Sequence, residues 1–157
     1  MKQKAIFAAG CFWGVQKRFN NIRGVISTKV GYSGGLKKYK NPSYEDVSSD
    51  KTGHAESIEI MFDSEKVNYK KLLDAFWKMH DPTLLNKQGL DIGKQYRSAI
   101  FYINETQKKD AIKSKEEYQK KLDKPIATDI TKAGEFYNAE EYHQKYYKKH
   151  KILGKVC

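Results

Sequence analysis

The chain has 157 residues and a mass of 18.2 kDa, which suits one compact domain and leaves little room for a second core. Hydrophobic residues make up 39% of the chain, enough for a folded core, and the longest apolar run, residues 5–15, is too short for the ~20-residue helix that crosses a membrane. The net charge is +11, but the lysines form scattered pairs, so we expect no nucleic-acid partner and no membrane partner.

The spacing of apolar residues predicts the elements of the first half of the chain. In order, we expect a strand over residues 4–9, a helix over 12–20, a strand over 25–32, a loop over 36–52 and a strand over 56–62. The helix follows from Phe12, Val15 and Phe19, which recur at helical spacing. The last strand alternates cleanly, with Ile58 and Ile60 on one face, so we expect it to be half-buried.

The second half continues in the same mixed pattern. We expect a helix from Asn68 to Asp81, a loop over 83–95, a strand over 98–103, a helix after Asn104, a strand over 126–130 and a tyrosine-rich helix over 139–150. Because some strands alternate and others do not, we predict an α+β fold, a two-layer sandwich of a mixed β-sheet with packed helices. We expect residues 1–157 to form one domain, with residues 151–157 as a flexible C-terminal tail.

The cysteines and histidines exclude several classes of protein. Two cysteines, Cys11 and Cys157, stand near opposite ends of the chain without a Cys-x-x-Cys motif, which rules out a disulfide-rich scaffold. His143 and His150 are seven residues apart on a predicted helix, about 10.5 Å along its axis, too far to share one ion. We expect no metal and no cofactor.

The N-terminus imitates a lipoprotein signal peptide. Basic Lys2 and Lys4 precede a short apolar stretch that ends at Cys11. Only residues 5–10 lie between the last lysine and the cysteine, fewer than the ~7 apolar residues that a secretory signal needs. We therefore expect a cytoplasmic protein, whose thiols stay reduced unless catalysis oxidises them.

Cys11 is the first candidate for chemistry. It follows Gly10 at the turn between a predicted strand and a predicted helix. At the N-terminus of a helix, unpaired backbone N–H groups and the helix dipole lower the pKa of a thiol and favour the nucleophilic thiolate. Taken alone, the residue also fits a small cysteine buried in a core turn.

Two aromatic residues directly after the cysteine favour the first interpretation. Phe12 and Trp13 are adjacent, so they cannot both point into one core stripe of a helix. At least one is expected to lie near Cys11. An aromatic wall beside a thiolate suits a small apolar group such as a methyl or a thioether.

The chain resembles the methionine sulfoxide reductase A family. The resemblance starts with the active-site signature, residues 10–14 (Gly-Cys-Phe-Trp-Gly), and continues in order through most of the chain. The matching blocks are Val30 to Gly35, Asn41 to Val47, Thr52 to Glu56, Phe76-Trp77, His80 to Thr83, Gln88-Gly89, Asp91 to Gly93 and Gln95 to Ser98.

This resemblance implies a fold that has a ferredoxin-like core, and it also implies a reaction. The reaction is reduction of the S epimer of methionine sulfoxide, free or in proteins, to methionine. By position, Cys11 is the nucleophile, and the substrate methyl pocket is formed by Phe12 and Trp13. The residues around the sulfoxide oxygen are Glu56, Tyr44 and Tyr96, and Asp91 helps hold the substrate.

The chemistry accounts for these residue types. Attack of a thiolate on the sulfoxide sulfur makes the oxygen a poor leaving group that needs a proton. Glu56 supplies that proton only if it is protonated at rest, which a poorly solvated aromatic pocket favours. Tyr44 and Tyr96 add O–H donors where negative charge develops. Without the resemblance, a surface carboxylate and two core tyrosines would be the plainer interpretation.

The resemblance also implies recycling by a second thiol and a protein reductant. Cys11 is left as a sulfenic acid, and Cys157 condenses with it to a disulfide that thioredoxin reduces. Relatives commonly carry such cysteines in a glycine-rich tail. Here the tail is short and Cys157 is the last residue, so an incidental terminal thiol is the alternative. We expect a monomer.

Two other functions remain to be tested. Cys11 paired with His54 as a base would give an acyl-transfer enzyme. The charge of +11 would alternatively serve a nucleic-acid-binding module, which would bind with a steep dependence on salt.

Overall fold

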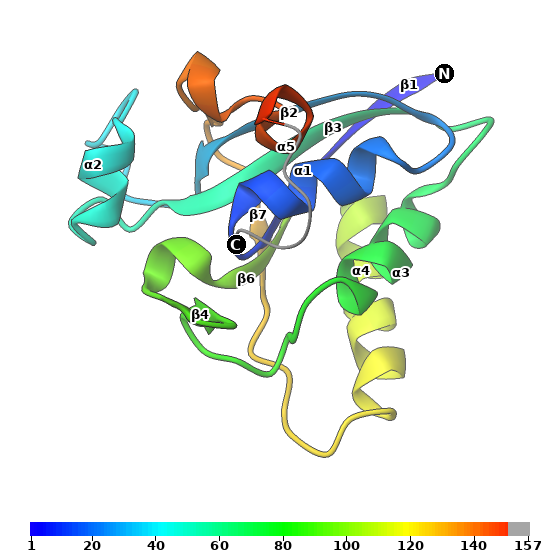
Figure 1. The fold of residues 1–157 in the computed structure, drawn as a ribbon. Coiled ribbons are helices and arrows are strands. Elements are labelled where there is room, and N and C mark those ends of the chain that lie inside the picture. The colour runs from blue at the N-terminus through cyan, green and yellow to red at the C-terminus, as the bar shows by residue number, and fades with distance from the viewer. Residues whose placement is uncertain (151–157) are drawn as a thin grey trace.

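A mixed β-sheet forms the centre of the computed structural model, which describes residues 1–150 (Figure 1). The strands are β1 (Lys2–Ala9), β2 (Val25–Ser33), β3 (Ala55–Asp63), β4 (Lys87–Gln88), β5 (Asp91–Ile92), β6 (Ser98–Tyr102), β7 (Asp129–Lys132) and β8 (Tyr137–Asn138). The helices are α1 (Phe12–Asn20), α2 (Tyr44–Ser48), α3 (Tyr69–Lys78), α4 (Glu105–Gln119) and α5 (Tyr146–His150), with short 3₁₀ turns η1 (Lys94–Tyr96) and η2 (Glu141–His143).

The sheet has a ferredoxin-like centre. Within residues 1–150 its strand order is β7-β6-β1-β3-β2-β8, and all neighbours are antiparallel except β6 and β7. In the inner four strands, α1 connects β1 to β2 and α3 lies between β3 and β6, which is the βαββαβ order. The predicted α+β fold with a mixed sheet is confirmed.

The main core lies between one face of this sheet and its helices. Phe7 of β1 is fully buried and stacks on Phe19 of α1 and Phe76 of α3. Ile58 and Ile60 of β3 are in the same cluster, as the alternation predicts. The opposite face carries a smaller cluster around Phe101, covered by residues 133–136 rather than by a helix. The two-layer arrangement is therefore observed (Figure 1).

Several local predictions agree with the structure because they rest on short-range signals. The helix over residues 12–20 is α1, with the predicted bounds. Asn68 caps α3, and Asn104 caps α4, each by accepting a hydrogen bond from a backbone N–H three residues on. These bonds form within one turn of chain.

Three predictions about loops and boundaries were wrong. The predicted loop over 36–52 contains α2, which Ser43 and Asp46 stabilise with a reciprocal capping box. The predicted loop over 83–95 contains the β4–β5 hairpin. The strand predicted over 126–130 is β7, which instead covers Asp129–Lys132, because these are the residues that pair in parallel with β6.

The final helix over 139–150 was also predicted wrongly. The chain there forms η2 and the short α5, separated by Lys145 at φ +51°. Between them, the side-chain amide of Gln144 accepts a hydrogen bond from the Val30 N–H at 2.9 Å and donates one to the Val30 carbonyl at 2.8 Å. This contact with the edge of β2 replaces the helical hydrogen bonds. Among residues 1–150, no helix is both long and apolar enough to span a membrane.

Candidate active site

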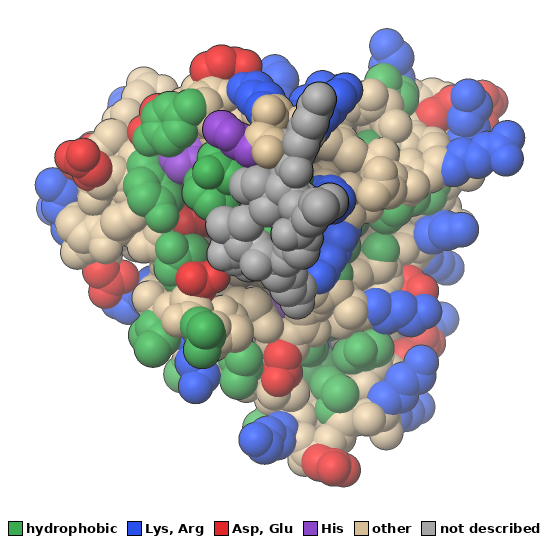
Figure 2. Space-filling view, in the orientation of Figure 1, with side chains coloured by type: hydrophobic (Ala, Val, Ile, Leu, Met, Phe, Trp, Pro, Cys, Tyr) green, Lys and Arg blue, Asp and Glu red, His purple; other side chains and the backbone are tan. Residues whose placement is uncertain are grey.

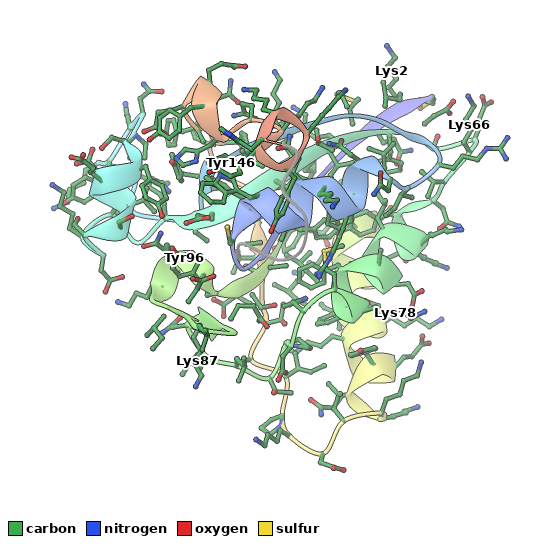
Figure 3. All side chains as sticks on the ribbon, viewed as in Figure 1. Lys2, Lys66, Lys78, Lys87, Tyr96 and Tyr146 are labelled. Atoms are coloured by element: carbon green, nitrogen blue, oxygen red, sulfur yellow. The ribbon has the colours of Figure 1, made fainter. Side chains whose placement is uncertain are left out.

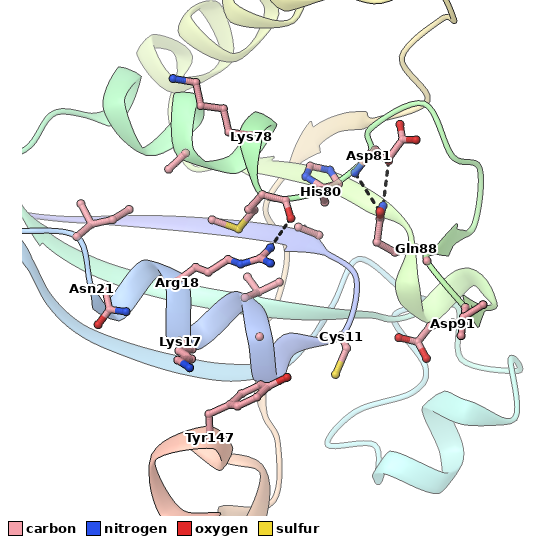
Figure 4. A pocket seen from close by; sticks show the side chains of 18 residues that line it. Cys11, Lys17, Arg18, Asn21, Lys78, His80, Asp81, Gln88, Asp91 and Tyr147 are labelled. Carbon is pink, nitrogen blue, oxygen red and sulfur yellow. Dashed lines mark hydrogen bonds between the residues drawn. The ribbon is translucent and has the colours of Figure 1, made fainter. Parts of the chain in front are cut away.

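Cys11 lies where β1 ends and α1 begins, as the sequence predicts (Figure 4). It is the N-cap residue of α1, and its side chain is half-buried. Gly10 before it has φ +94°, and a Cβ atom there would come within 2.9 Å of the side chain of Gln88. The turn therefore requires glycine, and it presents Cys11 at the helix end where backbone N–H groups favour an anion.

Glu56 is a carboxyl group buried close to the start of α1. It lies two residues before Ile58 on the same face of β3, next to the apolar core, and is only 1% exposed. Its Oε1 accepts a hydrogen bond from the Phe12 N–H at 3.2 Å, and its Oε2 accepts one from Gln95 Nε2 at 2.8 Å. Burial raises the pKa of Glu56 to about 7, against the effect of these two hydrogen bonds and with a further rise from the charge of Asp91. Near neutral pH a large fraction of this group carries a proton.

Tyr44 and Tyr96 bring two hydroxyl groups to the same region. Tyr44 begins α2 and Tyr96 ends η1, and their Oη atoms are 3.4 Å apart. Burial, the hydrogen bond with Tyr44 and the charge of Glu56 raise the pKa of Tyr96 well above its ordinary value. The Tyr96 phenol therefore stays protonated and is an O–H donor at any physiological pH.

The two aromatic residues after the cysteine divide between core and surface. Phe12 is 1% exposed and packs in a cluster with Tyr32. Trp13 is partly exposed, and its indole stacks on Tyr146 with centroids 3.6 Å apart and planes 4° apart. Figure 3 shows Tyr146 and Tyr96 on the same side of the molecule, near the beginning of α1. Trp13 thus forms an aromatic wall on the surface, and Phe12 supports it from inside.

The C-terminal segment adds residues that the sequence analysis missed. His143 is 2% exposed, and its Nδ1 accepts a hydrogen bond from Trp13 Nε1 at 2.9 Å. Glu140 accepts one hydrogen bond from the Tyr32 hydroxyl at 2.9 Å and another from the Tyr44 N–H at 3.0 Å. Burial lowers the pKa of His143, against the charge of Glu140, so the ring is neutral and can accept from the indole. These contacts orient Trp13 and Tyr44.

One signal in the sequence could have located these residues. The segment 139–144, Ala-Glu-Glu-Tyr-His-Gln, lacks the apolar stripe that a packed helix needs. Polar and aromatic residues that do not recur at helical spacing are typical of a segment whose side chains form hydrogen bonds and ring contacts with other parts of the fold.

Asp91 lies on a groove that begins at Cys11. The groove has a volume of about 1190 Å³, and α1, α3 and the β4–β5 hairpin supply most of its walls (Figure 4). Burial raises the pKa of Asp91 above its ordinary value. Asp91 thus lines the same groove as Cys11, and its charge contributes to the raised pKa of Glu56.

His54 does not have the environment of a catalytic base. It is 4% exposed, its Nδ1 accepts a hydrogen bond from the Gly35 N–H at 3.0 Å, and its Nε2 is 2.9 Å from the Tyr39 carbonyl. Because one ring nitrogen accepts, the other carries the proton and donates to that carbonyl. Both nitrogens are thus used to hold loops together, so the Cys-His alternative lacks its base.

The basic side chains do not gather into one binding surface. Figure 2 shows Lys and Arg spread among acidic and neutral side chains on the visible face. Lys2 and Lys66 lie near one another at one corner of the molecule, whereas Lys78 and Lys87 lie in two other places (Figure 3). This distribution agrees with a general lysine bias rather than a nucleic-acid footprint.

Cys157, the predicted resolving cysteine, lies outside the described residues. Within residues 1–150, no group of three or more His, Cys, Asp or Glu side chains is placed to hold a metal ion.

The family described as peptide methionine sulfoxide reductase matches residues 3–157 of this chain. The peptide methionine sulfoxide reductase MsrA of Methanosarcina acetivorans is 53% identical over 156 residues, which cover 98% of this chain and 82% of that protein. Among solved structures, reduced Mxr1 from Saccharomyces cerevisiae superposes with a TM-score of 0.93 at 36% identity, covering 99% of this chain and 89% of that one. Mxr1 in complex with Trx2 has a TM-score of 0.66 at 28% identity and covers 92% and 84% of the two chains.

Proposed function

The chain belongs to the peptide methionine sulfoxide reductase family, and we propose that Cys11 and Glu56 perform its reaction on the S epimer of the substrate. The enzyme reduces methionine sulfoxide to methionine with thiols as the source of electrons. One observation carries the residue assignment. The N–H of Phe12, the residue after Cys11, donates to Glu56, so the nucleophile and a buried carboxyl of raised pKa belong to one small site.

In the first step the Cys11 thiolate attacks the sulfoxide sulfur. An S–S bond forms, and the sulfoxide oxygen receives a proton from Glu56. Transfer of this oxygen to the Cys11 sulfur releases methionine and leaves a sulfenic acid on the enzyme. The substrate sulfur is reduced by two electrons and the cysteine sulfur is oxidised by two.

Glu56 suits the role of acid because it is buried and titrates near neutral pH. Its pKa of about 7 means that the proton is present at rest and leaves readily when the oxygen becomes negative. Tyr44 and Tyr96, whose hydroxyls are 3.4 Å apart, donate hydrogen bonds to the same oxygen. Trp13, supported by Phe12, forms the wall that contacts the substrate methyl, and Asp91 helps to hold the substrate.

In the second step a further thiol reduces the sulfenic acid. We assign this role to Cys157, whose thiol attacks the Cys11 sulfur, forms a disulfide and releases the oxygen as water. A dithiol protein of the thioredoxin class then reduces that disulfide. The structure of Mxr1 in complex with Trx2 supports this choice of reductant.

The groups proposed for the reaction come from one chain and from one domain. They range from Cys11 to Asp91 and Tyr96 within the described residues, which supports a single catalytic domain, and we propose that it acts as a monomer. A thiol cycle of this kind works in a reducing compartment, and we therefore propose that the enzyme acts in the cytoplasm.

A stereoresolved assay tests the proposal. The wild-type protein is given the separate S and R epimers of N-acetyl-methionine sulfoxide, with dithiothreitol as reductant, and methionine formation is measured. We expect turnover of the S epimer only, and none by Cys11→Ser with an unchanged circular dichroism spectrum. Activity on the R epimer, or residual activity of Cys11→Ser above a few per cent, would contradict the assignment.

A further inference from the structure

Gln95 is a buried amide beside the proposed acid, and the steps of the proposed reaction give it no role. It lies in η1 next to Tyr96 and is only 7% exposed, although glutamine is usually a surface residue. A buried amide needs hydrogen-bond partners within the protein. Gln95 Nε2 donates to Glu56 Oε2 at 2.8 Å, a shorter hydrogen bond than the 3.2 Å one from the Phe12 N–H to the other oxygen. Gln95 is therefore a direct partner of the carboxyl group.

The same amide connects the three elements that carry the proposed donors. Its Nε2 also donates to Ser48 Oγ at 3.4 Å, at the end of α2, and α2 begins with Tyr44. Gln95 itself precedes Tyr96 on η1, and Glu56 is on β3. Figure 3 shows Tyr96 on the same side of the molecule as α2. One side chain thus links the strand, the helix and the turn that present Glu56, Tyr44 and Tyr96.

The backbone of η1 is held in place, so the amide starts from a fixed position. Arg97 follows η1, and its Nη1 donates to the carbonyls of Lys94 and Gly53, both at 2.9 Å. Lys94 begins η1, and Gly53 stands two residues before the start of β3. Arg97 therefore ties η1 to the end of the strand that carries Glu56. The hydrogen bond from Gln95 to Glu56 does not have to be created when a substrate binds.

The direction of this hydrogen bond matters for the proton transfer. The NH₂ end of the Gln95 amide faces Glu56, and a donor binds an ionised carboxylate more strongly than a neutral carboxyl. Glu56 gains negative charge as its proton moves to the sulfoxide oxygen. A hydrogen bond that strengthens during the reaction lowers the barrier, whereas one of constant strength does not. In agreement, the bond from Gln95 lowers the pKa of Glu56, against the larger effect of burial.

The other titratable side chains around Glu56 come from several elements. They are Cys11 before α1, Tyr32 on β2, Tyr44 on α2, Asp91 on β5 and Tyr96 on η1, with Glu140 behind Tyr32 and Tyr44. Burial raises the pKa of Tyr32 and Tyr96 well above the ordinary value, so these two phenols stay neutral. The titrations of Cys11 and Asp91 can overlap with that of Glu56, so the clearest comparison is between proteins in which Cys11 is replaced and Asp91 is kept.

We propose that Gln95 is a positioning residue of the reaction, which holds the Glu56 carboxyl in place and stabilises the carboxylate that remains once the sulfoxide oxygen has taken the proton. The inference rests on the proposed function, because it takes Glu56 as the acid. Gln95 gives up no proton and acts through Glu56. Its role thus differs from that of Tyr44 and Tyr96, whose hydroxyl groups donate to the oxygen themselves.

Gln95→Met tests this role, because methionine keeps the length of the side chain and removes the hydrogen bond. The substrate is the S epimer of N-acetyl-methionine sulfoxide, and rapid quench measures the N-acetyl-methionine formed in one turnover, from acidic to alkaline pH. We expect the rate below neutral pH to fall roughly tenfold, and the decline on the alkaline side to move about one pH unit higher, the size expected of a hydrogen bond to a charged group.

Gln107→Met is the matched control. Gln107 is 4% exposed, and its Nε2 donates to the Lys4 carbonyl at 2.8 Å. Lys4 pairs with Met61, toward the opposite end of β3 from Glu56. This variant loses a buried amide hydrogen bond of the same kind, so its Tm should fall by a comparable amount. Its rate and its pH profile should remain those of the wild type.

A direct titration of Glu56 provides a readout that a merely structural role would not move. NMR of protein with ¹³C-labelled glutamate, in a Cys11→Ser background, follows the Glu56 carboxyl, whose signal is the one missing in Glu56→Gln. Gln95→Met should raise the pKa of Glu56 by about one unit, and Gln107→Met should leave it unchanged. Gln95→Glu keeps the shape of the side chain if the methionine variant does not fold. It should also raise the apparent pKa, because two facing carboxyls hold one proton between them to higher pH.

The outcomes separate this inference from the proposed function. An unchanged first-turnover rate in Glu56→Gln would contradict Glu56 as the acid and so the proposed function. A slow Glu56→Gln, together with a Gln95→Met variant whose pH profile and carboxyl titration match the wild type, would overturn only the role of Gln95. Ser48→Ala removes the contact of the amide with α2 and should leave the rate and the titration close to those of the wild type. A Ser48→Ala variant as slow as Gln95→Met would also overturn this role, because the effect would then belong to the position of α2.

Discussion

At the scale of the residue, the site depends on a carboxyl group that titrates far from its ordinary range. Glu56 is 1% exposed and has two hydrogen-bond donors, from Phe12 and Gln95, yet burial outweighs them and raises its pKa to about 7. A solvated carboxylate would be ionised at neutral pH and could not donate a proton. Burial therefore keeps a proton on Glu56 near neutral pH, as the proposed role of general acid requires.

Glu56→Gln removes that proton and keeps the shape of the side chain. The amide still accepts from the Phe12 N–H, and Gln95 can rotate its own amide to accept from the new NH₂ group. We expect the rate of the first turnover to fall roughly 10²–10⁴-fold, the usual span for general acid catalysis. The measurement is rapid-quench detection of methionine, and an unchanged rate would mean that Tyr44, Tyr96 or water supplies the proton.

The raised pKa also predicts how the rate depends on pH. The donor is present below pH 7 and is lost as pH rises through 7, so single-turnover kcat/KM should decline on the alkaline side. Glu56→Gln should lack this decline. The folded pKa lies above the unfolded value of about 4.5, so between these two values the folded protein binds more protons than the unfolded chain. The free energy of unfolding of the wild type should therefore fall as pH rises from about 4.5 to 7, and that of the variant should not. Urea titrations at several pH values provide this second, independent check.

At the scale of the element, the segment around η2 holds the site from outside the sheet. Glu140 binds both Tyr32 of β2 and Tyr44 of α2, and His143 binds Trp13 of α1. A short helix such as α2 has few contacts of its own, so it depends on such bonds for its position. The C-terminal segment therefore holds two side chains, Trp13 and Tyr44, to which we assign roles in the reaction.

Replacement of Glu140 measures this contribution. Glu140→Gln removes the charge and keeps one acceptor oxygen for the Tyr44 N–H, so the Tyr32 hydroxyl loses the carboxylate that accepts its proton and at best accepts from the new NH₂ group instead. We expect a loss of about 1 kcal/mol in the free energy of unfolding, or a fall in Tm of roughly 2–4 °C. Glu141→Gln is the matched control, because the Glu141 side chain is 89% exposed and should tolerate the same change. Equal melting temperatures for the two variants would refute this role of Glu140.

At the scale of the whole molecule, the proposed catalytic cycle joins residues near the two ends of the sequence. The proposed attacking residue is at position 11 and the proposed resolving residue is at position 157. Residues 151–156 would provide a connection of up to about 20 Å when extended, and a short connection raises the effective thiol concentration to the order of millimolar. In the proposed cycle the first step does not need this second thiol, but repeated turnover with thioredoxin does.

Cys157→Ser separates the two steps. The variant should form one methionine per enzyme at the wild-type rate and then stop when thioredoxin is the reductant. Dithiothreitol, which is small enough to reach Cys11 directly, should restore repeated turnover. Undiminished turnover with thioredoxin would show that Cys157 is not required and that Cys11 is recycled from outside.

The sequence by itself determined the parts of this protein that depend on neighbours along the chain. Helix α1, the caps at Asn68 and Asn104, and the alternation of β3 all follow from residues within a few positions of one another. Cys11 at the N-cap of α1 belongs to the same class, and the α+β fold follows from the order of these elements.

The tertiary structure decided the parts that depend on distant partners. The bond from Trp13 to His143 spans 130 positions and that from Tyr32 to Glu140 spans 108, so no local pattern could predict them. The same holds for the interrupted C-terminal helix, where Gln144 binds Val30 instead of continuing a helical turn. The pKa of Glu56 is the clearest case, because a carboxyl becomes a proton donor at neutral pH only when the surrounding fold removes it from water.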